Sequence, residues 1–385
     1  MNAEQKFFLK TLEDHIKEEK TSVPDSIDLE LVKNYAQSHQ LEPIFYYQTG
    51  NALFREAYYA QIVMYDIRAS VADELFGFLS DIPFFILKGI KVAKFYPVKE
   101  LRTMGDIDLL VHLEDREEVD KRLIEHGFEI ADKLTGEWEY LKNGVLIELH
   151  TALVYKYSKS TTDRKLQKYF NNCWNYYHDG ELDFNFHVLF LFMHLRKHIM
   201  ETGVGFRQFL DLAVLTLRAE LDWEWIRKEA EKLDLFSFIE MVMAFNQRCF
   251  NVPSPFKTDM IEDSFVENAV HIVFDDGVFG FENDNNQFNR AINEWKKTGN
   301  RFARTGVFFK HVLWPYEKMI TMPEYSWLRG KKYLLPLAWI NRAARKSKEW
   351  RRLKNRYYAS KSIADERYAY LEKWGIHNEK DRPNG

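Results

Sequence analysis

The segment Asp106–His112, with the sequence DIDLLVH, constrains the fold more than any other part of the chain. Its polar and apolar residues alternate, and successive side chains of a β-strand point to opposite faces of a sheet. On a strand, Asp106 and Asp108 therefore share one face, whereas Ile107 and Leu109 lie on the other. The pattern predicts a strand with two carboxylates on one face and a hydrophobic core behind the other.

The residues around this segment predict a small α/β unit between residues 81 and 155. An apolar run, FFIL, follows Pro83 and is typical of a buried strand. Asn143-Gly144 is a strong hairpin signal between two further strand-like runs. The expected elements are strands at 84–87, 106–112, 137–141 and 145–149, with helices at 89–96 and 113–127.

Helical patterns dominate on both sides of this unit, before residue 80 and after residue 182. A chain of 385 residues exceeds what one core usually holds. We therefore expect a fold of the α/β plus α class: an N-terminal helical segment (1–80), a core with a small mixed sheet (81–155), and a C-terminal helical domain (156–385). The expected long helices are at 52–79, 184–201, 206–220, 222–234, 236–250, 261–273, 286–297 and 333–359.

Composition and charge exclude several classes of protein. The net charge of -4 gives no global attraction for nucleic acid or anionic membranes. Two cysteines build neither a disulfide framework nor a four-thiolate zinc site. No stretch has the roughly 18 uninterrupted apolar residues of a transmembrane segment, and the charged start of the chain lacks a signal-peptide core. We therefore expect a cytoplasmic protein.

Glu148 completes a candidate acidic constellation. Within the strand expected at 145–149, Leu146, Glu148 and His150 share one face. If this strand neighbours the one that carries Asp106 and Asp108, three carboxylates converge. Clustered carboxylates repel one another unless a cation lies between them. A hard divalent ion with oxygen ligands, Mg²⁺ with Mn²⁺ as the alternative, fits this set, and two such ions would lie roughly 3.5–4 Å apart.

Four further residues are candidates for contacting a phosphorylated ligand. Lys88-Gly89 follows a predicted strand and opens a predicted helix, where glycine allows close backbone approach and the helix start favours phosphate. Lys88 and Arg102 would neutralise a triphosphate. His150 would orient a metal-bound carboxylate or contact the substrate; the alternative is a surface histidine at the end of a strand.

Each of these motifs alone has an ordinary structural explanation. An isolated Asp-x-Asp is usually a solvated strand edge, and a Lys-Gly pair is a weaker signal still. Their order along the chain carries the functional interpretation: an apolar strand, Lys-Gly, a short helix, the Asp-Ile-Asp strand, and then a hairpin whose second strand is acidic.

This order resembles the uncharacterised nucleotidyltransferase family of the polymerase beta superfamily. The resemblance rests on FFILKGIKVAKFYPVKELRTMGDIDLLV, on a helix that ends in HGF, and on LIELH. It implies a small sheet backed by helices and transfer of a nucleoside monophosphate from an NTP with Mg²⁺. By the same resemblance, Asp106 and Asp108 match the paired metal ligands. Glu148 matches the third carboxylate, the usual candidate for activating the acceptor hydroxyl.

One position departs from the pattern of the superfamily. The best-studied members have Gly-Ser where this chain has Lys88-Gly89-Ile90, so a serine that would touch phosphate is absent. Toxin-like and antibiotic-modifying relatives also have Lys-Gly here. The departure leaves the phosphate contact and the choice of nucleotide open.

The sequence does not select the acceptor, which could be a small molecule, an RNA or a protein. Two alternatives to the enzyme also stay open: a degenerate nucleotide-binding scaffold or regulatory module, and an RNA-modifying toxin. The segment 342–361 has nine basic residues and one acidic residue, so it is the expected contact for a polyanion, with a solvated helix face as the alternative.

The polar residues of the helical part are better explained by structure than by metal binding. His194 and His198 have the i, i+4 spacing of a metal pair, but no acidic residue follows at a matching distance. We expect buried polar groups with satisfied partners, such as an Arg207–Asp211 pair. A further hypothesis places Arg207 or His194 in the cleft between the helical part and the α/β core.

Overall fold

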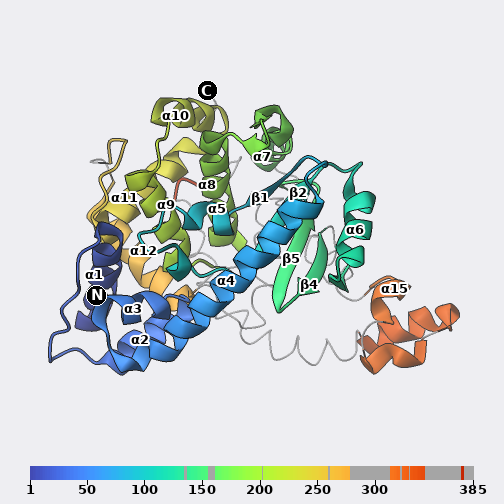
Figure 1. Cartoon of the computed structure of the whole chain (residues 1–385), viewed down its shortest axis with the longest axis horizontal. Coiled ribbons are helices and arrows are strands. Elements are labelled where there is room, and N and C mark those ends of the chain that lie inside the picture. Colours follow the sequence, from blue (N-terminus) through green and yellow to red (C-terminus); the bar gives the residue numbers. More distant parts are fainter. Residues whose placement is uncertain are drawn as a thin grey trace. The chain divides into compact units, whose positions relative to one another are not determined.

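The structure is a computed structural model that describes nine ranges of the chain. They are residues 1–133, 137–154, 161–201, 203–258, 261–277, 313–320, 323–328, 330–342 and 374–376. The chain divides into two compact units, which we describe separately: residues 1–157 with 161–282, and residues 158–160 with 283–385 (Figure 1). The described helices include none that is long and apolar enough to span a membrane.

The first unit contains a mixed five-stranded sheet, as the sequence predicts. Its strand order is β1-β2-β5-β4-β3, with β2 and β5 parallel and the other neighbours antiparallel. The predicted strands are present and differ from expectation by at most one residue at an end. The strands are β1 (Phe84–Leu87), β2 (Asp106–Val111), β3 (Glu129–Asp132), β4 (Trp138–Lys142) and β5 (Val145–His150).

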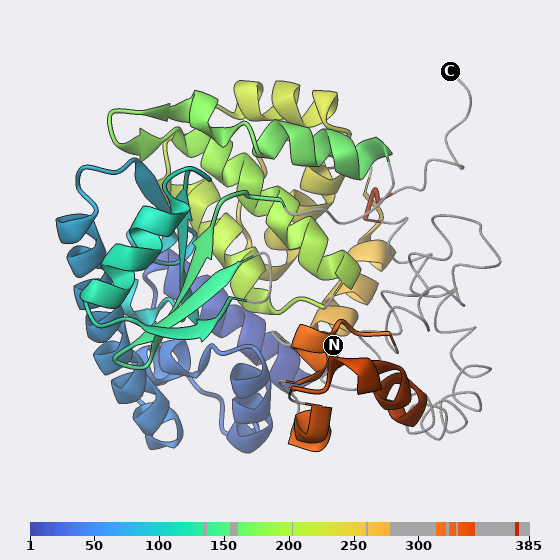
Figure 2. The same cartoon turned by 90° about the vertical axis from the view of Figure 1, so that its right-hand side faces the viewer.

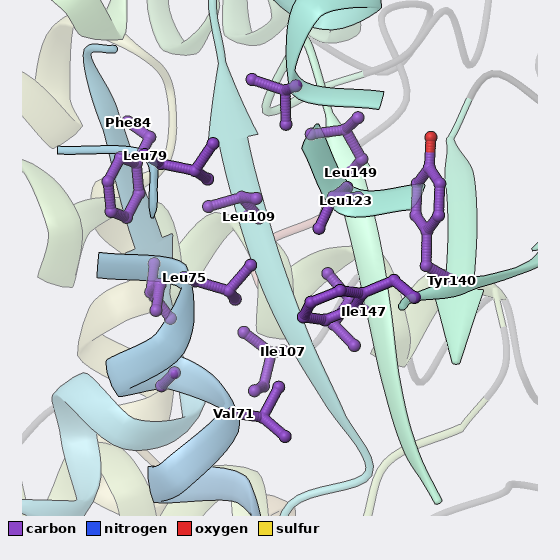
Figure 3. Packing of buried hydrophobic residues seen from close by; sticks show 14 of the residues in the cluster. Val71, Leu75, Leu79, Phe84, Ile107, Leu109, Leu123, Tyr140, Ile147 and Leu149 are labelled. Carbon is purple, nitrogen blue, oxygen red and sulfur yellow. The ribbon is translucent and has the colours of Figure 1, made fainter. Parts of the chain in front are cut away.

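Two helices cover the apolar face of this sheet. They are α4 (Arg55–Phe78) and α6 (Arg116–Glu125). In Figure 3, Val71 and Leu75 of α4 lie against Ile107 and Leu109 of β2, with Ile147 beside them. All five side chains are buried, and each stabilises the fold by about 1.5–3 kcal/mol through removal of apolar surface from water. The alternation in the sequence therefore assigns this face to the core and leaves the face of Asp108 for other tasks.

Helices from distant parts of the sequence complete the first unit. Figure 2 shows the yellow-green helices α8 and α9 next to the strands. The helices other than α4 and α6 are α1 (Ala3–Lys17), α2 (Leu29–Ser38), α3 (Glu42–Thr49), α5 (Gly89–Ala93), α7 (Thr161–Phe170), α8 (Phe184–Glu201), α9 (Phe206–Arg218), α10 (Trp223–Lys232), α11 (Phe236–Phe250) and α12 (Asp263–Asp276).

Aromatic side chains pack the N-terminal helices against helices α9 and α12. Phe8 of α1 lies 5.4 Å from Phe206 of α9 and 5.3 Å from Phe274 of α12, measured between ring centroids. His39, which follows α2, packs against the same phenylalanines. Offset and edge-on contacts of this kind are favourable beyond the area they bury. The many aromatic residues of the chain thus have a packing role here.

Sequence patterns missed the short elements. The edge strand β3 was not predicted because its residues, EIAD, are almost all exposed and show no alternation of burial. Helix α7 and the two-residue strands β6 (Tyr177–His178) and β7 (Glu181–Leu182) were also not predicted. By contrast, the helices expected at 184–201 and 236–250 match α8 and α11 to the residue. The division at residues 80 and 155 stays a prediction.

The second unit has a small core of its own. It contains α15 (Tyr316–Met319) and two 3₁₀ segments, Pro323–Leu328 and Lys332–Leu334. Met319, Tyr325, Leu328 and Ala338 are buried together. The helix expected at 286–297 lies outside the described residues, as does the helix expected at 333–359 beyond residue 342. Arg342, which packs on the ring of Trp314, is the one described residue of the basic segment 342–361.

We predict that buried histidines make the fold sensitive to acid, and His39 tests this. Burial lowers the pKa of His39 from its ordinary 6.5 to about 3, so the folded protein keeps the ring neutral where the unfolded chain protonates it. The stability that this histidine contributes is present above pH 6.5 and is lost as the pH falls towards 3. Linkage gives a loss of about 2 kcal/mol between pH 7 and pH 5.

The measurement is urea unfolding of the wild type and of His39→Asn at both pH values. The asparagine oxygen can replace the Nδ1 that accepts the backbone N–H of Phe206 at 3.4 Å, but it does not titrate. The variant is less stable at pH 7 because ring contacts are lost, yet its decrease towards pH 5 should be smaller by about 2 kcal/mol. Equal decreases in the two proteins would contradict the prediction.

Candidate functional site

The parallel pairing of β2 with β5 brings three candidate ligands together. Asp108 lies directly opposite Glu148 in the register, and Leu110 lies opposite His150. One ligand atom from each of Asp108, Glu148 and His150 lies within 4.8 Å of the other two. The two strands that carry the carboxylates, β2 and β5, are therefore neighbours in the sheet, as the sequence predicts.

Asp106 lies on the same face of the sheet but is not a member of this group of three. It is the first residue of β2, is partly buried, and pairs in register with Leu146. Burial raises the pKa of Asp106, and Asp108 and Glu148 raise it further, whereas Lys88 and Arg207 lower it. The side chain thus belongs to the electrostatic environment of the site, and its role as a metal ligand stays a prediction.

Lys88 provides a positive charge next to the buried carboxylate. Its Nζ lies 2.8 Å from Oδ1 of Asp108, whose side chain is 3% exposed. Burial would raise the pKa of Asp108, but Lys88 and a hydrogen bond from His150 hold it below its usual range. Asp108 is therefore ionised at neutral pH and is stabilised by cations of the protein itself.

His150 is the second cation of the site. Its Nε2 lies 3.2 Å from Oδ1 of Asp108 and 3.4 Å from Oε2 of Glu148. Burial opposes protonation, but hydrogen bonds to these two carboxylates raise the pKa of His150 to about 9. The imidazole is thus protonated at neutral pH. The alternative of a surface histidine does not fit, because the side chain of His150 is buried next to Asp108, and its role in orienting a metal-bound carboxylate or contacting substrate stays a prediction.

The donor set fits a divalent ion. Two carboxylates with oxygen donors suit Mg²⁺ or Mn²⁺, whereas an imidazole nitrogen suits transition metals better and must first lose its proton. We infer from this chemistry that Asp108 and Glu148 are the members of the group that fit Mg²⁺. His150 fits better as a neighbour that orients them.

Helix α8 places a row of histidines near the same site. His187, His194 and His198 have the spacing of one helix face, and burial lowers the pKa of each ring. Their neighbours include Lys88, whose charge lowers all three pKa values further. Nε2 of His194 lies 2.8 Å from Nε2 of His198, so one ring donates to the other. Among the described residues, the group of three possible metal ligands includes neither His194 nor His198.

His187 is the residue of this row that the sequence analysis missed. Its Nε2 accepts a hydrogen bond from the backbone N–H of Lys88 at 3.2 Å. The two residues are 99 positions apart, and a histidine within an apolar helix gives no local signal of such a contact. The one available hint was its seven-residue spacing from His194, which places both on one face of α8.

Arg102 lies between α9 and the Lys88-Gly89 turn. Its Nε and Nη2 donate to the two carboxylate oxygens of Asp211 at 3.0 and 2.7 Å. The hydroxyl of Tyr96 donates to the same carboxylate at 2.7 Å. The remaining nitrogen, Nη1, is next to Gly89, where an added Cβ would lie 3.9 Å from it. Arg102 is thus held by one carboxylate and still borders the turn.

The expected pair between Arg207 and Asp211 is replaced by a different arrangement. Arg207 donates to the side chain of Gln40 at 2.7 Å and to the carbonyl of Thr103 at 3.4 Å. Asp211 takes Arg102 as its partner instead, because that guanidinium reaches both carboxylate oxygens. The charge of Arg207 still lowers the pKa of Asp106, which places Arg207 near the acidic face.

A family profile identifies the class of this protein. The profile described as an uncharacterised nucleotidyltransferase matches residues 25–251, which is more than half of the chain. The chain therefore belongs to this family, and the resemblance seen in the sequence is confirmed. No curated protein and no solved structure matches the chain. The matched range contains the five-stranded sheet, the acidic group and α8.

We predict that the buried pair of Arg102 and Asp211 supports the fold, beyond any contact of Arg102 with a ligand. Removal of one partner of a buried pair leaves an uncompensated charge and costs about 3–5 kcal/mol. Asp211→Ala should therefore lower the free energy of unfolding by at least about 3 kcal/mol. Chemical denaturation measures this directly.

The matched control is the exposed pair of Arg227 and Glu231, joined at 2.8 Å. Because water screens this pair, Glu231→Ala should cost less than about 1 kcal/mol. Similar small effects of both substitutions would show that the Arg102–Asp211 pair adds little to stability.

Proposed function

We propose that this protein is a Mg²⁺-dependent enzyme that transfers a nucleoside monophosphate from an NTP to an acceptor hydroxyl. The observation that carries the proposal is the register of β2 and β5, which places Asp108 opposite Glu148 beside the Lys88-Gly89 turn. Membership in a nucleotidyltransferase family supports the same chemistry. Asp106, Asp108 and Glu148 are the proposed metal ligands, and all three also act in catalysis.

The proposed reaction balances without a further reactant. The acceptor oxygen bonds to the α-phosphorus, the bond from that phosphorus to the bridging oxygen breaks, and pyrophosphate leaves. Glu148, which is half-buried on β5, takes the hydroxyl proton. Bound divalent ions would supply charge neutralisation at the transferred group.

The basic residues have distinct proposed roles in binding the triphosphate. Lys88 pairs with Asp108 and would exchange this carboxylate for phosphate oxygens. Gly89 allows the backbone to approach the phosphates, and the Nη1 of Arg102 next to it adds charge. His150 would orient Asp108 and Glu148. The acceptor and the preferred NTP stay open, whereas a cytoplasmic location and contact of 342–361 with a polyanion stay predictions from the sequence.

One observation favours a second function, a nucleotide-binding scaffold without turnover. Lys88 and a protonated His150 both contact Asp108, so two cations of the protein already neutralise part of the acidic group. A site of this kind could bind nucleotide without a metal. The dependence of nucleotide binding on Mg²⁺ therefore separates the enzyme from the scaffold.

Calorimetric titration with ATP, CTP, GTP and UTP, each with and without Mg²⁺, tests the proposal. We expect one NTP to bind only with Mg²⁺. Asp108→Asn should weaken this binding at least about ten-fold, because it removes the charge of a metal ligand. Glu129→Gln is the matched control, since it removes an exposed acidic charge from the edge strand of the same sheet and should leave the affinity unchanged.

Two results would contradict the enzyme proposal. NTP binding that is equally tight without Mg²⁺ and in Asp108→Asn would favour the scaffold. Absence of binding for all four nucleotides would remove the NTP as the first ligand of the site.

A further inference from the structure

Lys88 has a backbone conformation that a residue with a side chain rarely adopts. Its φ is 51° and its ψ is -126°. Conformations of this kind are strained and persist only where the surrounding structure holds them. Lys88 forms the whole connection between β1 and α5, and its ammonium reaches Asp108 from this position. Some contact must therefore hold its backbone.

His187 makes a contact of this kind. The backbone N–H of Lys88 donates to its Nε2 at 3.2 Å. Lys88 precedes the first turn of α5, so no carbonyl within that helix accepts its backbone N–H, and the acceptor comes from another element. His187 lies near the start of α8 and is 4% exposed, so packing fixes the position of its ring.

The imidazole is suited to accept this hydrogen bond. Burial and the nearby charges of Lys91 and Lys94 lower the pKa of His187 to about 3, so the ring is neutral. The hydrogen bond to Nε2 then requires the tautomer that carries its proton on Nδ1. The ring also packs edge-on against Phe184, at 5.8 Å between ring centroids. An apolar residue at 187 could keep this packing contact but could not accept the N–H.

We propose that His187 is a positioning residue that holds the backbone of Lys88 so that the ammonium can serve both Asp108 and the phosphates of the nucleotide. The contact of Lys88 with nucleotide phosphates rests on the proposed function, whereas the positioning of Lys88 by His187 rests on geometry alone. Helix α8 thus has a direct task in the site, because it fixes the position of Lys88, the cation that follows strand β1. His187 acts through Lys88 and is not itself a catalytic residue.

Two substitutions separate the hydrogen bond from the packing. His187→Leu fills much of the ring volume without an acceptor, whereas the amide oxygen of His187→Gln can reach the position of Nε2. With the NTP that binds to the wild type, we expect His187→Leu to weaken binding about ten-fold, in line with the loss of an orienting contact. His187→Gln should restore the affinity to within about three-fold, and His15→Leu, at a buried histidine of α1, should bind like the wild type.

A double-mutant cycle with Lys88→Met tests whether His187 acts through Lys88. If it does, His187→Leu has no further effect on NTP affinity once the ammonium is gone. A general structural defect would instead weaken binding by the same factor in both backgrounds. That result, or wild-type affinity in His187→Leu, would overturn the proposal.

A measurement without nucleotide keeps the inference separate from the proposed function. Hydrogen exchange followed by NMR reports on the Lys88 amide directly, and protection should be lost in His187→Leu and kept in His187→Gln. If no NTP binds to the wild type, the proposed function fails, while loss of protection still supports the positioning of Lys88. An amide that stays protected in His187→Leu would overturn the inference, whatever the nucleotide result.

Discussion

The contact between Lys88 and Asp108 is the interaction on which the rest of the site depends. Asp108 is almost fully buried, and an unpaired charge in such a position would be strongly unfavourable. Lys88 at 2.8 Å and a protonated His150 compensate it, so the carboxylate stays ionised within the fold. A ligand that enters must therefore exchange partners with these cations. Under the proposed function, this arrangement provides an ionised carboxylate for a metal ion and a lysine for the phosphates of the nucleotide.

The two faces of the sheet have separate tasks. Helices α4 and α6 pack against Ile107, Leu109 and Ile147, and this core fixes the strands. The opposite face carries Asp108 and Glu148, and helices from the later part of the chain reach it through polar contacts. His187 of α8 binds the backbone of Lys88, and Asp211 of α9 binds Arg102 next to Gly89. The helical part thus contacts Lys88 and Arg102, while the sheet carries the carboxylates and His150.

The sequence predicted what local patterns determine. Alternation and the Asn143-Gly144 hairpin gave the strands, and they placed Asp108 and Glu148 on the faces where the structure has them. The pairing of Lys88 with Asp108 and of Arg102 with Asp211 depends on tertiary packing, which no spacing in the sequence encodes. His187 was missed for the same reason, since its partner is 99 residues away. The exposed strand β3 lacked the alternation that reveals a buried one.

The most direct test of this account is a crystal structure with Mn²⁺ and a non-hydrolysable analogue of the NTP that binds. Manganese has an anomalous signal that identifies its position without reference to the protein. We expect a peak in contact with the carboxylates of Asp108 and Glu148, with the ammonium of Lys88 moved from Asp108 to the phosphates. A bound nucleotide without a metal peak, with Lys88 still on Asp108, would contradict it.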